Sequence, residues 1–444
     1  MYTNNRTLKD LSFIGQSSEG NILSLIDRCS TYIGSKLLQQ QLAQSPKSYE
    51  QLLAQQAAVQ FWHQHLDQWP KQISNGTIVM VEKFYASADA YSGHAPSIQP
   101  FGGKFFQKLF NRNEYHFTQF SLSHLSDFIK GCTAFVDLLA EQIELPSLLK
   151  ETLLAMQTAL QQRLCKDLIE LNQQTAFKEI VRLSFHARRE MKATVHELTT
   201  LFGTLDLWYG MAVATKENNW HFPELSAADQ VCLQAQGLYH PLLQHPIQYN
   251  IAFGEEHNFM ILTGANMSGK TTLMRSIGIA AILAHLGMGV PAEAMQISYL
   301  ESVISNMHVE DDLLKGESFF LAEVKNIKQT AIAAAQKAPQ LILMDELFKG
   351  TNVHDAYECT KAIVAGLLQH PQHIMILSTH LHEVARYFEQ NKQLNFYCFH
   401  TQLSSEGNFE FNYQLAKGIS DERIGYKILV KEGVVGILNG EQNN

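Results

Sequence analysis

The sequence predicts an α + α/β fold, with a helical domain at residues 1–219 and an α/β domain at residues 220–444. Two patterns indicate this division. Before residue 220, apolar residues recur near the 3.6-residue period of helices, whereas after it short β-like runs alternate with helical stretches. Such alternation is typical of a sheet covered by helices. The boundary is expected near Lys216–Pro223, and 444 residues are enough for two or three domains.

The helical half contains two long periodic stretches. The first is Leu23–Leu42, which has apolar side chains available for one face and is followed by Pro46 as a stop signal. The second is Glu151–Leu207, which has no proline and no glycine before Gly203 and therefore favours extended helices packed on one another. Between them, Tyr91–Gly103 is rich in glycine and proline and is expected to form a loop.

The second half contains the elements of an α/β sheet. Strands are predicted at Phe259–Leu262, Leu341–Met344 and His373–Leu377. Helices are predicted at Lys270–Leu286, Phe320–Gln336 and Asp355–Gln369. Ligands of such sheets bind at the carboxyl ends of the strands, so the residues that follow each strand are the first candidates for a functional site.

The charge of the chain is unevenly distributed. There are 34 Lys and Arg residues and 43 Asp and Glu residues; residues 1–220 contain 20 of each sign, so the whole acidic excess lies in the remainder. This composition differs from that of a strongly basic nucleic-acid-binding protein. Binding of DNA would require a local basic patch, which we expect in the first half, and its affinity would depend on salt.

The sequence favours a cytoplasmic protein that does not enter a membrane. The N-terminus, MYTNNRTLKDL, lacks the pattern of a signal peptide, and the longest apolar stretch, Ile277–Val290, is too short to span a bilayer. The cysteines are scattered without a C-x-x-C pair, which indicates reduced core thiols instead of a disulfide framework or a zinc site. They are Cys29, Cys132, Cys165, Cys232, Cys359 and Cys398.

A phosphate-binding loop is predicted directly after the first of these strands. Gly264–Thr271 has the pattern G-x-x-x-x-G-K-T, in which the glycines let backbone N–H groups point at phosphate oxygens. Lys270 supplies a positive charge for the β- and γ-phosphates, and the Thr271 hydroxyl suits a Mg²⁺ ion. The alternative, a chance match, is disfavoured by the strand before and the helix after. The candidate nucleotide-binding residues are Gly264, Ala265, Asn266, Met267, Ser268, Gly269, Lys270, Thr271 and Thr272.

Two acidic residues follow the strand at Leu341–Met344. Asp345 stands where a metal-binding carboxylate is expected, and Glu346 can polarise an attacking water molecule. A solvated acidic pair at a strand end is the alternative, and the phosphate-binding loop in the same domain makes it less favoured. The two motifs together predict that the chain binds and hydrolyses a nucleoside triphosphate with Mg²⁺.

His380 and Ser318 are two further catalytic candidates. His380 follows the strand at His373–Leu377 and can sense the γ-phosphate or position water, although a histidine there is often only structural. Ser318 can cap the helix that follows it, or it can present the end of that helix to a phosphate on a partner subunit. The sequence leaves both roles of Ser318 open.

As a set, these motifs resemble those of the MutS family of DNA mismatch-repair ATPases. The resemblance is carried by Thr263–Arg275 with its Asn266-Met267 pair, Ser318–Glu323 preceded by Asp311-Asp312-Leu313, Asp345–Thr351, Thr379-His380, Tyr239-His240-Pro241 and Gly425-Tyr426. The segment Leu23–Pro46 is also similar to the start of the family's helical core. The likeness therefore covers most of the chain.

The resemblance implies an elongated helical core/lever domain with a reduced clamp at residues 1–219, followed by an ABC-type P-loop ATPase domain with a β-sheet flanked by helices. It implies ATP and Mg²⁺ as cofactors, with Thr271 and Asp345 holding the metal ion and Glu346 as general base. Ser318 would reach a nucleotide on a second subunit, so a homodimer with composite ATP sites is implied. DNA, whether duplex, mismatched or branched, and mismatch-repair proteins are the implied partners.

The chain also departs from the family pattern. In this sequence the helical core is expected to begin within the first few residues, so that the family's N-terminal mismatch-reading and connector domains are not expected in it, and Gly425-Tyr426 stands near its end. Because no aromatic wedge with its glutamate is found, the resemblance does not imply direct mismatch reading by this chain. The family's adenine-stacking residue has no clear counterpart; Ile247 and Tyr249 are the candidates offered by His245–Tyr249.

Other hypotheses remain beside a DNA-coupled ATPase. The neutral helical half also fits a nucleotide-switched protein scaffold without DNA contact. A P-loop ATPase of the SMC or transporter type is disfavoured, because Leu23–Pro46 matches the MutS core and an LSGGQ-like signature is missing. The aromatic and basic segment Phe101–Phe120 can contact nucleic acid, but core packing is favoured. The basic residues Arg182, Arg188, Arg189 and Lys192 can do the same, but an ordinary solvated face is favoured.

Overall fold

The computed structural model describes residues 1–15, 20–89, 112–140, 144–172, 174–227, 231–307, 319–403, 409–420, 429–430 and 434–438. The chain forms two compact units. The first, called here the sheet unit, consists of Met1–Leu25, Gln41–Leu53 and Glu217–Asn444. The second, the helical unit, consists of Ile26–Gln40 and Ala54–Lys216.

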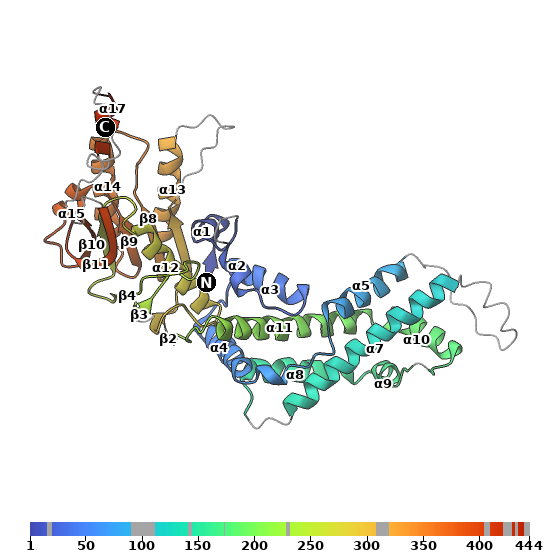
Figure 1. The fold of residues 1–444 in the computed structure, drawn as a ribbon. Coiled ribbons are helices and arrows are strands. Elements are labelled where there is room, and N and C mark those ends of the chain that lie inside the picture. The colour runs from blue at the N-terminus through green and yellow to red at the C-terminus, as the bar shows by residue number, and fades with distance from the viewer. Residues whose placement is uncertain are drawn as a thin grey trace. The chain divides into compact units, whose positions relative to one another are not determined.

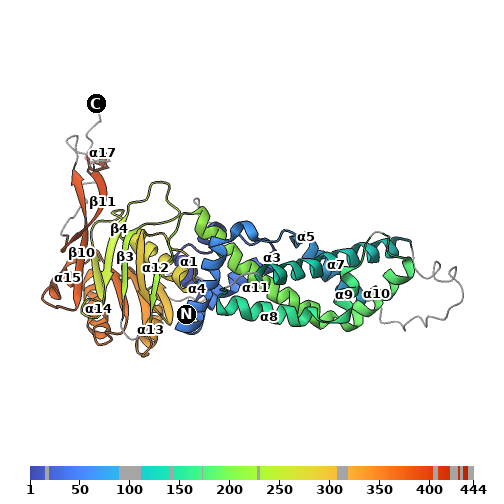
Figure 2. The same ribbon diagram turned by 90° about the horizontal axis from the view of Figure 1, so that it is seen from below.

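A seven-stranded sheet lies in the sheet unit. Figures 1 and 2 show its strands packed among the helices of this unit. Its strand order is β1-β7-β8-β9-β5-β10-β11. The strands are β1 (Tyr2–Thr3), β5 (Phe259–Thr263), β7 (Ser302–Asn306), β8 (Gln340–Asp345), β9 (Ile374–Ser378), β10 (Leu394–Leu403) and β11 (Phe409–Lys417). Neighbouring strands are parallel except for the antiparallel β10–β11 pair. The carboxyl ends of β5, β8 and β9 therefore meet at one edge of the sheet.

Helices cover both faces of this sheet. Ile342 and Met344 of β8 contribute to a buried apolar cluster with α13 (Phe319–Ala334), α14 (Val353–Leu367) and α15 (His382–Tyr387). On the other face lies α12 (Lys270–His285), where a Cβ added to Gly278 would come within 2.9 Å of Leu343. Because both faces are covered, every residue of β5, β8 and β9 is buried, as expected for parallel strands.

The strands and helices predicted in the second half are all present. Each of the three predicted strands and three predicted helices matches an observed element, with ends that differ by at most two residues. A second sheet in the sheet unit, of order β2-β6-β3-β4, was not predicted. Its strands are β2 (Glu224–Ser226), β3 (Leu233–Leu238), β4 (Tyr249–Phe253) and β6 (Ala294–Ser298).

The predicted division of the chain at residues 219 and 220 needs a correction. The N-terminal residues belong to the sheet unit, because β1 pairs with β7 at the edge of the large sheet. In the following helix α1 (Asn5–Asp10), the Thr7 hydroxyl accepts a hydrogen bond from the Ser305 N–H at 3.1 Å. The Asp10 carboxylate accepts from the Ser305 hydroxyl at 2.7 Å and from the Met307 N–H at 3.0 Å. These pairings span nearly 300 residues, which no local pattern reveals.

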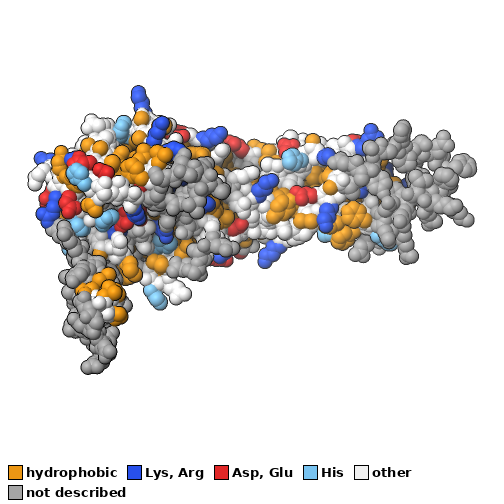
Figure 3. Space-filling view, turned by 90° about the horizontal axis from the view of Figure 1, so that it is seen from above, with side chains coloured by type: hydrophobic (Ala, Val, Ile, Leu, Met, Phe, Trp, Pro, Cys, Tyr) orange, Lys and Arg blue, Asp and Glu red, His pale blue; other side chains and the backbone are white. Residues whose placement is uncertain are grey.

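The helical unit packs around an aromatic core. Trp69 stacks on Tyr209 with ring centroids 4.1 Å apart. Phe135 lies edge-on to Trp69 and also to Phe202. The helices that lie wholly or partly in this unit are α2 (Ile22–Ile26), α3 (Tyr32–Ala43), α4 (Tyr49–Gln64), α5 (Asn75–Asp89), α7 (Arg112–Ala140), α8 (Ser147–Leu160), α9 (Arg163–Ile169), α10 (Phe177–Glu190) and α11 (Lys192–Glu217). The short helix α17 (Val434–Leu438) belongs to the sheet unit. On the face drawn in Figure 3, basic, acidic and apolar side chains are interspersed along the helical unit.

The two long periodic stretches are each interrupted. Leu23–Leu42 is divided between α2 and α3, because the buried carboxylate of Asp206 accepts hydrogen bonds from the N–H groups of Ser30 at 2.7 Å and Thr31 at 2.8 Å. These donors at the start of α3 thus obtain a cap from a distant helix. Glu151–Leu207 is divided among α8, α9, α10 and α11. Helical periodicity predicted the type of structure but not its breaks.

Several predicted features lie outside the described residues. They are the loop after Tyr91, the aromatic and basic residues from Lys104 to Phe110, Asp311-Asp312, Ser318 and Gly425-Tyr426. The six cysteines are all described and all are free thiols, three of them buried. Among the described helices, none is long and apolar enough to cross a membrane.

Candidate nucleotide-binding site

The turn between β5 and α12 requires both of its glycines. Gly264 has φ +139°, and a Cβ there would lie 3.0 Å from the Phe399 carbonyl oxygen. Gly269, directly before α12, has φ +109°. Such φ values are costly for any residue with a Cβ. Met267 nevertheless has φ +67° while its side chain is 79% exposed, so the loop is held in a strained conformation.

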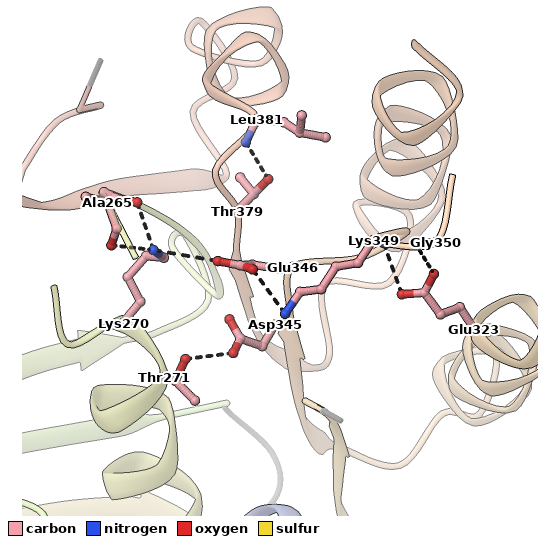
Figure 4. Close-up of polar contacts among 11 residues, drawn as sticks. Ala265, Lys270, Thr271, Glu323, Asp345, Glu346, Lys349, Gly350, Thr379 and Leu381 are labelled. Carbon is pink, nitrogen blue, oxygen red and sulfur yellow. Dashed lines mark hydrogen bonds and ion pairs between the residues drawn. The ribbon is translucent and has the colours of Figure 1, made fainter. Parts of the chain in front are cut away.

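Lys270 is the first residue of α12, and its ammonium group is enclosed by this loop. Its side chain is 4% exposed, and Nζ donates hydrogen bonds of 2.8 Å to the carbonyl oxygens of Gly264 and Ala265, as Figure 4 shows. Burial lowers the pKa of this ammonium group, whereas the nearby carboxylates of Glu346 and Asp345 act in the opposite direction. The loop thus wraps a cation at the N-terminus of α12, where an anion is favoured by the helix dipole.

Thr271 and Asp345, the two residues expected to bind a metal ion, are in direct contact. The Thr271 hydroxyl donates to Oδ2 of Asp345 at 2.7 Å. The other oxygen, Oδ1, is buried and has no hydrogen-bond partner among the described residues. A buried carboxylate oxygen without a partner is costly unless a ligand completes it. The donor set of one hydroxyl and one carboxylate therefore fits Mg²⁺, which takes few protein ligands besides phosphate and water.

Glu346 extends into the same space from the strand end. Its backbone has φ +52°, and its N–H donates to the Ser378 carbonyl oxygen at 2.9 Å. Its carboxylate lies 3.8 Å from Lys270 Nζ and 3.0 Å from Lys349 Nζ (Figure 4). Burial raises the pKa of this carboxyl, but Lys349, Lys270 and His380 together outweigh burial, so its pKa lies below the usual range. The group is therefore ionised near neutral pH and can accept a proton.

A cleft of about 590 Å³ opens over these groups. One side is the phosphate-binding loop from Asn266 to Thr272, together with Asp345, Glu346 and Lys349. The other lining residues, called here the side wall, are His240, Leu243, Gln244, His245, Ile247, Tyr249 and Tyr413. The cleft thus combines a polar, charged side with a largely apolar and aromatic one, which is the usual composition of a cofactor site.

Comparisons with known proteins agree with this geometry. The family model described as MutS domain V matches residues 260–435. The DNA mismatch repair protein MutS of Methanosarcina acetivorans is 28% identical over 267 residues, which is 58% of this chain and 29% of that protein. The MutS protein of Streptococcus uberis is 27% identical over 267 residues, covering 58% of this chain and 31% of that protein. The DNA mismatch repair protein MSH7 of Arabidopsis thaliana is 29% identical over 241 residues, covering 48% of this chain and 22% of that protein.

Residues 260–435 of the chain are therefore similar to domain V of MutS proteins. The matched region spans less than a third of the length of these curated relatives. The domain V match begins within β5 and extends beyond β11, so it contains the phosphate-binding loop, Asp345 and Glu346. The resemblance stated from the motifs alone is thereby supported for residues 260–435.

The structure brings most of the predicted MutS-like residues to one place. The loop residues from Asn266 to Thr272 line the cleft with Asp345 and Glu346, while Gly264 and Ala265 bind Lys270 through their carbonyl groups. His380 follows the end of β9 and is exposed, and it is near enough to Glu346 to lower the pKa of that carboxyl. Ser318 lies outside the described residues, so its role stays a prediction.

The sequence predicted only some of the residues that form the side wall of this MutS-like site. Ile247 and Tyr249, the two adenine candidates, both line the cleft, as does His240 of the Tyr239-His240-Pro241 motif. Burial and the charge of Arg275 lower the pKa of His240 to about 4, so this side chain is neutral near pH 7. Tyr413 was missed, because the β10–β11 hairpin brings it beside Gly269 from 144 residues away. No short-range signal marks that proximity.

Proposed function

We propose that this chain binds ATP with Mg²⁺, hydrolyses it, and couples the nucleotide state to the binding of DNA. The observation that supports this most strongly is the convergence of Lys270, the Thr271–Asp345 pair and Glu346 in one cleft. Phosphate recognition, a metal-binding pair and an ionised base are the parts that phosphoryl transfer requires. The names of the curated relatives, which are DNA mismatch repair proteins, support the DNA part of the proposal.

In this proposal the loop holds the triphosphate. Backbone N–H groups between Gly264 and Thr272 and the Lys270 ammonium bind phosphate oxygens. Thr271 and Asp345 hold Mg²⁺, which when bound neutralises charge on the β- and γ-phosphates. The side wall receives the base, with Tyr249 and Ile247 as contacts from one segment and Tyr413 from another. Aromatic faces bind a purine by stacking.

Glu346 acts as the general base in the proposed reaction. A water molecule attacks the γ-phosphorus while its proton passes to the Glu346 carboxylate. The bond between the γ-phosphorus and its bridging oxygen breaks, and ADP leaves with the bond electrons. Lys270 offsets the charge that develops on the phosphate oxygens. His380, near Glu346, is proposed to sense the γ-phosphate or to orient the water molecule.

The DNA part of the proposal requires a local contact surface. Arg182 already forms ion pairs with Glu179 at 2.5 Å and with Asp167 at 3.1 Å, so its charge is largely compensated within the chain. Arg189 lies over the Phe185 ring with its guanidinium carbon 5.3 Å from the centroid. The interspersed charges of Figure 3 predict modest, salt-sensitive binding to duplex, mismatched or branched DNA. We further propose a cytoplasmic homodimer with composite ATP sites, in which Ser318 reaches the partner's nucleotide, acting with mismatch-repair proteins.

The nucleotide half of this proposal is tested by calorimetry and hydrolysis assays. The wild-type chain is expected to bind ATP with Mg²⁺, and Lys270→Ala is expected to bind it at least about a hundred-fold more weakly, because a buried cation in the loop is lost. Glu346→Gln is expected to bind ATP normally but hydrolyse it on the order of a hundred-fold more slowly. Failure of the wild-type chain to bind any nucleotide would contradict the proposal.

The DNA half is tested separately. Gel-shift assays at low salt on duplex, mismatched and junction DNA are expected to show binding that changes with ATP and weakens as salt rises. If nucleotide binds but no DNA is shifted, the nucleotide-switched scaffold becomes the better hypothesis. A stoichiometric protein that co-purifies with the chain and is released by ATP would then be expected.

A further inference from the structure

The segment that carries Glu346 is held in an unfavourable backbone conformation. Between β8 and α14, both Glu346 and Phe348 have positive φ values, +52° and +63°. Neither is a glycine, and such conformations persist only where the surrounding structure fixes them. The structure must therefore contain contacts that hold residues 346–350 in place.

Two of these contacts come from α13. The Phe348 side chain is buried and lies beside Phe320, with ring centroids 5.9 Å apart. The Glu323 carboxylate is 5% exposed, and its two oxygens accept hydrogen bonds from the N–H groups of Lys349 at 3.2 Å and Gly350 at 3.3 Å (Figure 4). Both oxygens of one ionisable side chain are thus used on the backbone that follows Glu346. Hydrogen bonds to an ionised carboxylate are among the stronger ones in proteins.

The backbone held by Glu323 includes residue 349 and therefore also positions the Lys349 side chain. Lys349 Nζ lies 3.0 Å from Glu346 Oε2, while Lys270 Nζ lies 3.8 Å from Oε1. The Glu346 carboxylate is therefore held between two ammonium groups. Glu323, Lys349 and Glu346 also line a second, smaller cavity of about 210 Å³, so this arrangement borders open space that would let the carboxylate move if it were released.

We propose that Glu323 and Lys349 are positioning residues for Glu346: Glu323 fixes the backbone at residues 349–350, and Lys349 then holds the Glu346 carboxylate facing the cleft. This inference rests on the proposed function, in which Glu346 takes a proton from water. Because Glu323 belongs to α13, any displacement of that helix is transmitted to the base. An error of about 1 Å in such a group can cost on the order of a hundred-fold in rate.

The inference is tested in the full chain with Lys349→Met, Lys349→Arg, Glu323→Gln and the double variant Glu323→Gln/Lys349→Met. Lys361→Met is the matched control, because Lys361 forms an ion pair with Glu358 at the same i,i+3 spacing on α14, outside the cleft. Single-turnover ATP hydrolysis, calorimetric affinity for a non-hydrolysable ATP analogue and the melting temperature are measured for each variant.

Positioning predicts a specific pattern. Lys349→Met and Glu323→Gln each slow hydrolysis about ten-fold or more, with analogue affinity within about two-fold of the wild type. Lys349→Arg restores most of the rate. The double variant is no slower than the slower single variant, because both residues act through Glu346. Lys361→Met hydrolyses ATP at the wild-type rate. When Glu346 is already replaced by Gln, neither Lys349→Met nor Glu323→Gln slows hydrolysis further.

Three outcomes in the variants overturn the inference and leave the proposed function standing, and one outcome in the wild type overturns both. An unchanged or faster rate for Lys349→Met removes its positioning role, and this side chain is exposed enough that the variant should fold even if Glu323→Gln does not. A loss of affinity equal to the loss of rate would make Lys349 a phosphate ligand instead. Additive losses in the double variant would separate Glu323 from Glu346. A wild-type chain that binds ATP analogue but shows no hydrolysis overturns both.

Discussion

The two sides of the cleft are constructed in different ways. The phosphate-binding side is mainly one continuous segment, Gly264–Thr272, whereas the side wall combines residues 240–249 with Tyr413 of the β10–β11 hairpin. Backbone N–H groups can point at phosphate only when adjacent residues adopt a defined set of φ and ψ values. A flat base can be received by any side chains of suitable shape. The first side should therefore tolerate few substitutions and the second side many.

The largest effect is expected from Gly264→Ala. The new Cβ would lie 3.0 Å from the Phe399 carbonyl oxygen, and residue 264 has φ +139°, which alanine rarely adopts. The loop must therefore change shape. We expect nucleotide affinity to fall at least about a hundred-fold, measured by calorimetry. Gly366→Ala is the control, because nothing lies within 4 Å of a Cβ at that position in α14. Normal affinity for Gly264→Ala would mean that the backbone of the loop does not bind the phosphates.

A smaller effect is expected from Asp345→Asn. The amide can still accept the hydrogen bond from Thr271, so the local fold should persist, but the negative charge proposed to bind Mg²⁺ is lost. We expect Mg²⁺-dependent hydrolysis to fall by tens of fold or more, while nucleotide binding without Mg²⁺ changes little. Hydrolysis assays across a Mg²⁺ titration measure this. If the Mg²⁺ requirement is the same in both proteins, Asp345 is not a metal ligand.

Tyr413→Ala tests the side wall, where the effect should be weaker. Loss of one aromatic contact is expected to weaken ATP binding about ten-fold with little change in the rate at saturating ATP. Tyr413→Phe should bind ATP normally, since it keeps the ring. Tyr387→Ala, at an exposed tyrosine of α15, is the matched control. An effect as large as that of Gly264→Ala would contradict the proposed difference between the two sides.

The smallest effect concerns the pH dependence of folding. In the folded chain the pKa of His240 is about 4, below its ordinary value of 6.5, because the side chain is buried near Arg275. The unfolded chain therefore binds an additional proton between pH 6.5 and pH 4, and stability must fall as the pH is lowered through this window. We expect His240→Gln to reduce this loss by up to about 3 kcal/mol.

Chemical denaturation at several pH values measures the His240 contribution. The difference in stability between the wild-type and His240→Gln proteins should be constant above pH 6.5 and should shift in favour of His240→Gln as the pH falls toward 4. Parallel pH dependence in the two proteins would show that His240 is protonated normally in the folded state. The side wall near it would then be more open to water than its burial indicates.

The sequence by itself determined the parts of the protein that depend on neighbouring residues. The turn between β5 and α12, proposed to bind phosphate, is specified by Gly264, Gly269 and Lys270, and Asp345-Glu346 follows a run of apolar residues that is buried in β8. The strands and helices around them were predictable for the same reason, because hydrophobic period and glycine placement act within one or two turns of chain. The resemblance to MutS proteins followed from these motifs taken as a set.

Only the tertiary structure decided the features that join distant segments. The pairing of β1 with β7, the Asp206 carboxylate at the start of α3, Tyr413 in the side wall and Glu323 on the Lys349–Gly350 backbone each link residues far apart in the chain. Each satisfies a polar group or fills a space that another segment creates. A local pattern cannot specify them, because the cost of an unpaired buried donor appears only once the chain has folded around it.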